Sequence, residues 1–283
     1  MAEWSDHDAA INGLTIHYYR MGARNKPPVL LLHGYSDSGL AWTRLAHDLA
    51  PEYDLIMPDA VSHGRSSGPG PDGFRSRAVS DVVTLIEMLG LERPALVGHS
   101  MGARTAAGVA AEVGDHVRCA VLEDPPWRDT SSEPSRVSAG DTGRPSQSPI
   151  GTPRWLEWLA DWKALTPDER AARVAEERPT WADEDRLPWA ESKAQFNLDA
   201  LNDPMASTPT PWREIVRTII CPVLLITADP ERGGIVTPDV AHEAAALWRT
   251  GRVVQIANAG HNIRRDQYEP FRTAVTAFLR ENV

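Results

Sequence analysis

The sequence Gly98-His99-Ser100-Met101-Gly102 places a serine between two glycines, directly after the apolar run 95–97. A Gly-x-Ser-x-Gly sequence between a short strand and a helix is typical of a nucleophile elbow, a tight turn that lifts the serine hydroxyl clear of a sheet. Small residues at 103–111 are expected to form that helix. Ser100 is therefore the predicted nucleophile, although the motif also occurs by chance and depends on its context.

A serine hydroxyl is a weak nucleophile near neutral pH and needs a general base, normally a histidine, within hydrogen-bond reach. His261 is the best candidate, because it follows the last predicted strand in a turn of small residues. A loop at that edge of a sheet would bring its imidazole over Ser100. His99, inside the elbow, is expected to point away from the substrate, while His33 and His63 are interpreted as structural or rim residues.

The tetrahedral intermediate of acyl transfer carries a negative oxygen that needs backbone N–H groups aimed at it. In this geometry one donor is the residue after the nucleophile, Met101, and the other comes from the loop after an earlier strand. The apolar run 29–32 ends in His33-Gly34-Tyr35, so Tyr35 is predicted to supply the second N–H. Loss of one such donor typically raises the barrier by about 3 kcal/mol.

Short apolar runs typical of buried strands alternate with stretches of helical periodicity along most of the chain. The predicted strands are 11–20, 29–32, 54–57, 95–97, 117–122, 222–228 and 252–256, and the predicted helices are 40–49, 77–89 and 266–280. Such alternation predicts the α/β class, with a mostly parallel, doubly wound sheet. Ligands in these sheets bind beyond the carboxyl ends of the strands, which is where the candidate residues lie.

Residues 127–212 interrupt this alternation, and we predict that they form an inserted helical cap over a core of 1–126 and 213–283. Residues 128–152 are rich in Ser, Pro, Gly and Thr and are expected to be a mobile loop. Six of the ten tryptophans fall in its helical stretch, 153–212: Trp155, Trp158, Trp162, Trp181, Trp189 and Trp212. Each of them either packs the cap or lines an apolar pocket between cap and core.

Length and composition fit one large α/β domain with a modest insertion, since the chain has 283 residues of which 42% are hydrophobic. A net charge of −10 without a basic cluster argues against nucleic acid or an anionic membrane as partner. Cys119 and Cys221 are interpreted as core residues of a reduced, cytoplasmic protein. The acidic N-terminus lacks the apolar stretch of a signal peptide. A homo-oligomer is compatible with the sequence.

Four motifs together resemble the α/β-hydrolase superfamily: Leu30-Leu31-Leu32-His33-Gly34, Pro58-Asp59 with His63-Gly64-Arg65-Ser66, the elbow, and Ala259-Gly260-His261. The resemblance covers nearly the whole chain outside the predicted cap. It implies the α/β-hydrolase fold and hydrolysis of an ester, lactone, amide or carbon–carbon bond, with no metal and no organic cofactor. A serine at the elbow argues against the dehalogenase and epoxide hydrolase branches, which have aspartate there.

The carboxylate expected to orient the histidine departs from the pattern of this family. In most members it follows the strand before the last, where this chain has Asp229 and Glu231. Other members place it after the preceding strand, where this chain has Asp124. We favour Asp124 and keep Asp229 and Glu231 as alternatives. A loop-capping role for Asp124 and an Asx-turn for Asp229 would be purely structural.

From these residues we expect a serine hydrolase that cleaves a small to medium apolar carboxylic ester or lactone through an acyl-enzyme. Two alternatives remain, a carbon–carbon bond hydrolase of a ring-fission diketone and a slow-turnover receptor for a small ligand. Arg264 and Arg265 are interpreted as surface charges that pair with Asp266 or Glu269. The other reading is that they bind a substrate carboxylate.

Overall fold

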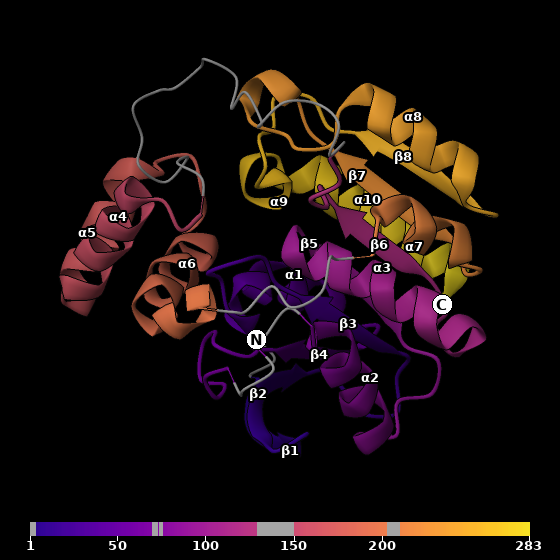
Figure 1. Cartoon of the computed structure of the whole chain (residues 1–283), viewed down its shortest axis with the longest axis horizontal. Helices are drawn as coiled ribbons and strands as arrows, with labels where there is room; N and C mark the ends of the chain where they lie inside the picture. Colours follow the sequence, from indigo (N-terminus) through magenta and orange to yellow (C-terminus); the bar gives the residue numbers. More distant parts are fainter. Residues whose placement is uncertain (1–3, 70–72, 74–75, 129–149, 203–209) are drawn as a thin grey trace.

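The computed structural model describes residues 4–69, 73, 76–128, 150–202 and 210–283. Its centre is a sheet of eight strands in the order β1-β2-β4-β3-β5-β6-β7-β8 (Figure 1). The strands are β1 Ser5–Ile11, β2 Leu14–Met21, β3 Pro28–Leu32, β4 Asp54–Pro58, β5 Ala95–His99, β6 Ala120–Glu123, β7 Val223–Thr227 and β8 Gly251–Gln255. The strands from β4 to β8 in this order are parallel, while β1 and β2 are antiparallel to their neighbours. The predicted α/β class with a mostly parallel sheet is confirmed.

Helices cover both faces of the sheet, because buried parallel strands have apolar side chains on both sides. In β3, for example, Val29 and Leu31 pack into one core cluster, and Leu30 and Leu32 into the other. The face that carries Leu30 and Leu32 is covered by α2 (Ala78–Met88), α3 (Met101–Val113), α7 (Trp212–Thr218) and α8 (Pro238–Leu247). The opposite face is covered by α1 (Thr43–Leu49), α9 (Ile263–Asp266) and α10 (Tyr268–Asn282).

Between β6 and α7, the described residues form three further α-helices, α4 (Pro153–Ala164), α5 (Pro167–Glu177) and α6 (Asp183–Gln195). Figure 1 shows them gathered at one side of the molecule. The side chains of Thr152 and Thr166 cap α4 and α5, each of which has proline at its first position. The predicted loop 128–152 lies almost entirely outside the described residues, and the division into core and cap stays a prediction.

The tryptophans of the insertion are buried, and four of them form one cluster. The rings of Trp158, Trp162, Trp181 and Trp189 contact one another with centroid distances of 5.2 to 6.4 Å. These four therefore pack the inserted helices against each other. Trp155 contacts this cluster through Trp158, at 6.2 Å, and also has neighbours at the site, described below.

The N-terminal strand differs from its prediction, because the single strand expected at 11–20 is a hairpin of β1 and β2. Asn12 and Gly13 form the turn, with φ of 48° and 80°. An Asn-Gly pair tolerates such positive φ values and favours a two-residue hairpin turn. The first half of β1 is polar, so this strand lacks the apolar run that would have predicted it.

Both cysteines are free and buried. Cys119 packs into the core cluster on one face of the sheet and Cys221 into the cluster on the other. Among the helices of the described residues, none is both long and apolar enough to cross a membrane.

Candidate active site

Ser100 lies in a sharp turn between β5 and α3, with φ 52° and ψ −113°. Such a conformation costs a non-glycine residue about 1–3 kcal/mol and persists only where the surroundings enforce it. A Cβ added to Gly98 would lie 2.3 Å from the carbonyl oxygen of Gly102, and one added to Gly102 would lie 2.1 Å from that of Leu32. Backbone packing therefore requires both glycines, as in the predicted elbow.

His261 pairs with a buried carboxylate: its Nδ1 lies 2.6 Å from Oδ2 of Asp124. The Asp124 side chain is fully buried, whereas that of His261 is 29% exposed. The same carboxylate accepts the backbone N–H groups of Ile235 and Val236 at 2.9–3.1 Å. When Nδ1 donates to Asp124, Nε2 keeps a lone pair and can accept a proton, as a general base must.

The two alternative carboxylates are engaged elsewhere. Asp229 accepts the backbone N–H of Asn258 at 2.7 Å and the side-chain amide of Gln255 at 3.3 Å. Glu231 is exposed in a single 3₁₀ turn. The carboxylate that the structure brings to His261 is thus that of Asp124.

His99 lies beneath His261, with 4.7 Å between the ring centroids. Its Nε2 is 2.9 Å from the carbonyl oxygen of His261. Burial, together with the positive charge of Arg264, holds the pKa of His99 well below its usual range. The neutral ring therefore donates Nε2–H to that carbonyl. His99 thus points toward the backbone of His261, a contact that the sequence interpretation missed.

The predicted oxyanion donors lie at the end of β3 and the start of α3. Met101 is the first residue of α3, so its N–H has no partner within the helix. In the loop that contains Tyr35, the carbonyl of Gly34 accepts Nδ1–H of His33 at 2.8 Å and the N–H of Asp37 at 3.1 Å. These contacts fix the chain on both sides of Tyr35.

His33 is held in one tautomer by its two contacts. While Nδ1 donates to Gly34, Nε2 accepts the backbone N–H of Ala60 at 2.9 Å. Burial lowers the pKa of His33, which keeps the ring neutral as this pattern requires. The prediction of a structural role for His33 agrees with this geometry.

Aromatic rings surround Tyr35. The rings of His63, Trp155 and Phe196 lie 5.4, 6.2 and 5.1 Å from its centroid. Trp155 comes from α4, so the inserted helices reach this side of the site. A cavity of about 50 Å³ lies nearby, between the sheet, α2 and α3, and its walls include Leu32, Val61, Val82, Leu85 and Met101. The surroundings of the site are thus mainly apolar.

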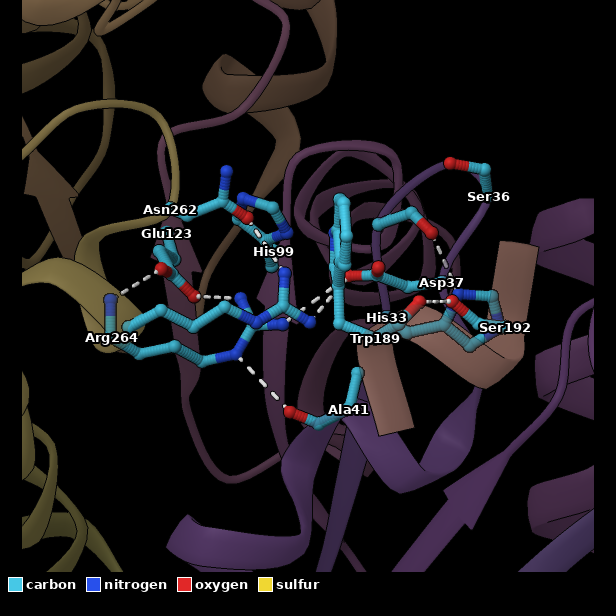
Figure 2. A network of polar contacts seen from close by, with 12 residues as sticks. His33, Ser36, Asp37, Ala41, His99, Glu123, Trp189, Ser192, Asn262 and Arg264 are labelled. Atoms are coloured by element: carbon cyan, nitrogen blue, oxygen red, sulfur yellow. Dashed lines mark hydrogen bonds and ion pairs between the residues drawn. The ribbon is translucent and has the colours of Figure 1, made fainter. Parts of the chain in front are cut away.

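The interpretation of Arg264 and Arg265 as surface charges is wrong, because both are only 2% exposed. Arg264 donates to Glu123 at 3.0 Å (Figure 2). Arg265 donates to Asp37 at 3.0 Å. The short helix α9 turns both side chains inward, where buried cations need carboxylate partners. Of the partners expected for them, Asp266 instead accepts Nε1–H of Trp181, and Glu269 pairs with Arg272.

No group of three or more His, Cys, Asp or Glu side chains in the described part of the chain is arranged to hold a metal ion.

Comparison with known proteins gives matches over nearly the whole chain. Residues 29–274 match the model of the Alpha/beta hydrolase family. The chain is 28% identical to N-formylmaleamate deformylase of Pseudomonas putida, covering 96% of this chain and 95% of that protein. It is 29% identical to lipase LipV of Mycobacterium tuberculosis over 74% of each chain. The crystal structure of N-formylmaleamic acid deformylase from Pseudomonas putida S16 superposes with a TM-score of 0.76 at 23% identity, covering 96% and 100% of the two chains.

Proposed function

Because this chain belongs to the alpha/beta hydrolase family, we propose that it is a serine hydrolase that cleaves a small to medium apolar carboxylic ester or lactone. The observation that carries this proposal is the 2.6 Å contact between His261 and Asp124, next to the strained turn of Ser100, whose neighbour His99 packs against His261. A histidine oriented by a carboxylate next to a serine in such a turn is the arrangement that activates a serine hydroxyl.

In the proposed reaction, Ser100 Oγ attacks the substrate carbonyl while His261 Nε2 takes the hydroxyl proton. The backbone N–H groups of Tyr35 and Met101 bind the oxygen that becomes negative. Collapse of this intermediate expels the alcohol, which receives its proton from His261, and leaves an acyl-enzyme on Ser100. Water activated by His261 then releases the acid. Asp124 stays ionised and stabilises the imidazolium that forms at each step.

The residues around the proposed site favour a substrate whose acyl group is apolar and of modest size. The rings near Tyr35 and the cavity beside Met101 are apolar. Lys193, Arg264 and Arg265, the buried cations nearest the site, already contact carboxylates. The name of the lipase relative is in line with ester hydrolysis. We also propose that the protein works in a reducing compartment, the cytoplasm, since both cysteines are free.

Deformylation is a second candidate, because one relative that matches nearly full length is named a deformylase. The same residues would serve it: Ser100 would attack a formyl carbonyl, and His261 would protonate the departing nitrogen. The carbon–carbon hydrolase and the slow-turnover receptor remain alternatives without an observation that favours them.

A substrate panel tests the proposal. We expect turnover of p-nitrophenyl acetate and butyrate and of a small γ-lactone by the wild type, lost in Ser100→Ala and retained in Ser80→Ala, which alters a serine on α2. Faster cleavage of an N-formyl amide would favour the second candidate, and faster cleavage of a vinylogous diketone the carbon–carbon hydrolase. Calorimetric binding of these compounds without turnover would support the receptor and contradict the proposal.

A further inference from the structure

A cluster of buried charges lies behind the loop 33–38, which carries the proposed oxyanion donor Tyr35 (Figure 2). Asp37 is at its centre and is contacted by Lys193 at 3.1 Å, Arg265 at 3.0 Å and Arg264 at 3.4 Å. Although burial by itself raises the pKa of Asp37, these three cations hold it well below its usual range. Asp37 is therefore ionised and binds side chains from two separate parts of the chain.

Arg264 and Arg265 connect this loop to the rest of the site. Both belong to α9, which begins two residues after His261. Arg264 also contacts Glu123, the neighbour of Asp124, through its backbone N–H at 2.9 Å and its guanidinium at 3.0 Å. The loops that carry the candidate base and acid are thus joined to Asp37 from the core side.

Lys193 comes from the other direction, from helix α6 of the insertion. Its ammonium group donates to the carbonyl of Ser36 at 2.7 Å, the hydroxyl of Ser36 at 3.1 Å and the carboxylate of Asp37 at 3.1 Å. An ammonium group has three N–H bonds, so these contacts use all of its donors. Ser36 itself has φ 59°, a left-handed conformation that needs support in a non-glycine residue.

Stability alone does not explain a lysine at this position. Lys193 is 2% exposed, and burial lowers its pKa to about 8 even though Asp37 opposes the shift. Apolar side chains at buried ionic positions are often as stable or more stable. The contact gives instead a fixed position to the peptide groups directly after Tyr35.

We propose that Lys193 is a positioning residue, which holds the oxyanion loop 33–38 from helix α6 and so aims the N–H of Tyr35. The proposal rests on the proposed function, because it needs an oxyanion formed at Ser100. The loop is held from the core by Arg264 and Arg265 and from the insertion by Lys193. The proposed oxyanion hole is therefore complete only when α6 is seated against the core.

The test compares Lys193→Met with Arg170→Met. Arg170 is a buried cation of the insertion that pairs with Glu191 at 3.0 Å and does not contact the loop. Two rates are measured: kcat and KM for p-nitrophenyl butyrate, and the maximal rate at which a fluorophosphonate phosphonylates Ser100. In the second reaction the serine oxygen displaces fluoride from phosphorus, and the phosphoryl oxygen occupies the oxyanion hole.

We expect Lys193→Met to lower kcat and the maximal phosphonylation rate about 10- to 100-fold, because a misplaced donor loses most of its effect. KM should stay within about threefold, and Arg170→Met should keep both rates within about twofold of the wild type. If Lys193→Met is too unstable to purify, Lys193→Gln replaces it. Its shorter, uncharged amide can keep only part of the contacts, so both rates should fall less than expected for Lys193→Met but more than twofold.

Equal rates in the Lys193 and Arg170 variants, at equal melting temperatures, would overturn the positioning role. The positioning role would also be overturned if Lys193→Met raised KM and left kcat unchanged. A wild-type protein whose Ser100 neither turns over the ester nor reacts with the fluorophosphonate would instead contradict the proposed function itself.

Discussion

Nε2 of His99 lies 2.9 Å from the carbonyl oxygen of His261, so the residue before the proposed nucleophile supports the backbone of the proposed base. This contact ties the loop after β8 to the elbow after β5. The spacing between Ser100 and His261 therefore depends on a side chain that takes no part in proton transfer.

Replacing His99 tests this support. His99→Phe keeps a ring but leaves the carbonyl of His261 without its donor, so kcat should fall about tenfold and the free energy of unfolding by about 1–3 kcal/mol. His99→Gln places an amide nitrogen near the position of Nε2 and should recover most of both. Ester kinetics and urea unfolding measure the two effects, and equal kcat in the Phe and Gln variants would contradict the account.

The identity of the orienting acid is tested by a matched pair of substitutions. Asp124→Asn should lower kcat about 10³- to 10⁴-fold, because an amide cannot hold His261 in the required tautomer or stabilise the imidazolium. Asp229→Asn should change kcat less than about threefold, since Asp229 contacts Asn258, Gln255 and Arg232 rather than His261. A large loss of kcat in Asp229→Asn with little loss in Asp124→Asn would instead identify Asp229, in the loop after β7, as the orienting acid.

Because His63 is buried, we expect it to make the free energy of unfolding depend on pH. Burial lowers its pKa from 6.5 to about 3, while Nδ1–H donates to the carbonyl of Val61. Between these two values the unfolded chain binds a proton that the folded chain does not, so the free energy of unfolding falls as pH decreases below about 6.5. One such histidine contributes up to about 1.4 kcal/mol per pH unit in this window.

His63→Asn keeps a donor near the position of Nδ1 and removes the titrating ring. Its free energy of unfolding should therefore depend less steeply on pH between 4.5 and 6 than that of the wild type. His116→Asn, at an exposed position, is the control and should leave the slope unchanged. Identical slopes in wild type and His63→Asn, measured by denaturant titration, would show that His63 does not titrate as expected.

Gly102 and Gly90 have different surroundings. Replacing each by alanine therefore distinguishes the cost of a steric clash from the cost of a strained backbone conformation. In Gly102→Ala the new Cβ would lie 2.1 Å from the carbonyl oxygen of Leu32, which requires a backbone shift and should cost about 3 kcal/mol or more. Gly90 has φ 61° but open space around a new Cβ, so Gly90→Ala should cost about 1–2 kcal/mol. Only Gly102→Ala should also lower kcat. A similar loss of stability and activity in both variants would count against the proposed elbow packing.

The parts of the fold that follow local rules were predictable from the sequence. Apolar runs and tight turns gave the parallel strands and the turn at Ser100, and the turn after the last strand pointed to His261. The order of motifs left Asp124, Asp229 and Glu231 open as the acid. The charge cluster was not predictable, because its members are far apart along the chain: Lys193 and Ser36 by 157 residues, Arg265 and Asp37 by 228. In a sequence, such polar residues look like surface residues.

A weak signal for the cluster was present nonetheless. Glu123 precedes Asp124 at the end of an apolar strand, where a second carboxylate is expected to need a cation. Arg264 and Arg265 follow His261 in a loop that must return to the same edge of the sheet. Joining these two observations would have placed at least one arginine inside the protein.

Formation of an acyl-enzyme on Ser100 can be tested by pre-steady-state hydrolysis of p-nitrophenyl acetate. We expect a burst of about one p-nitrophenolate per chain followed by slower turnover. Mass spectrometry of the quenched protein should place one acetyl group on the elbow peptide. In Ser100→Ala both the burst and the adduct should be absent. Turnover that persists in Ser100→Ala, or an acetyl group on another residue, would contradict the account.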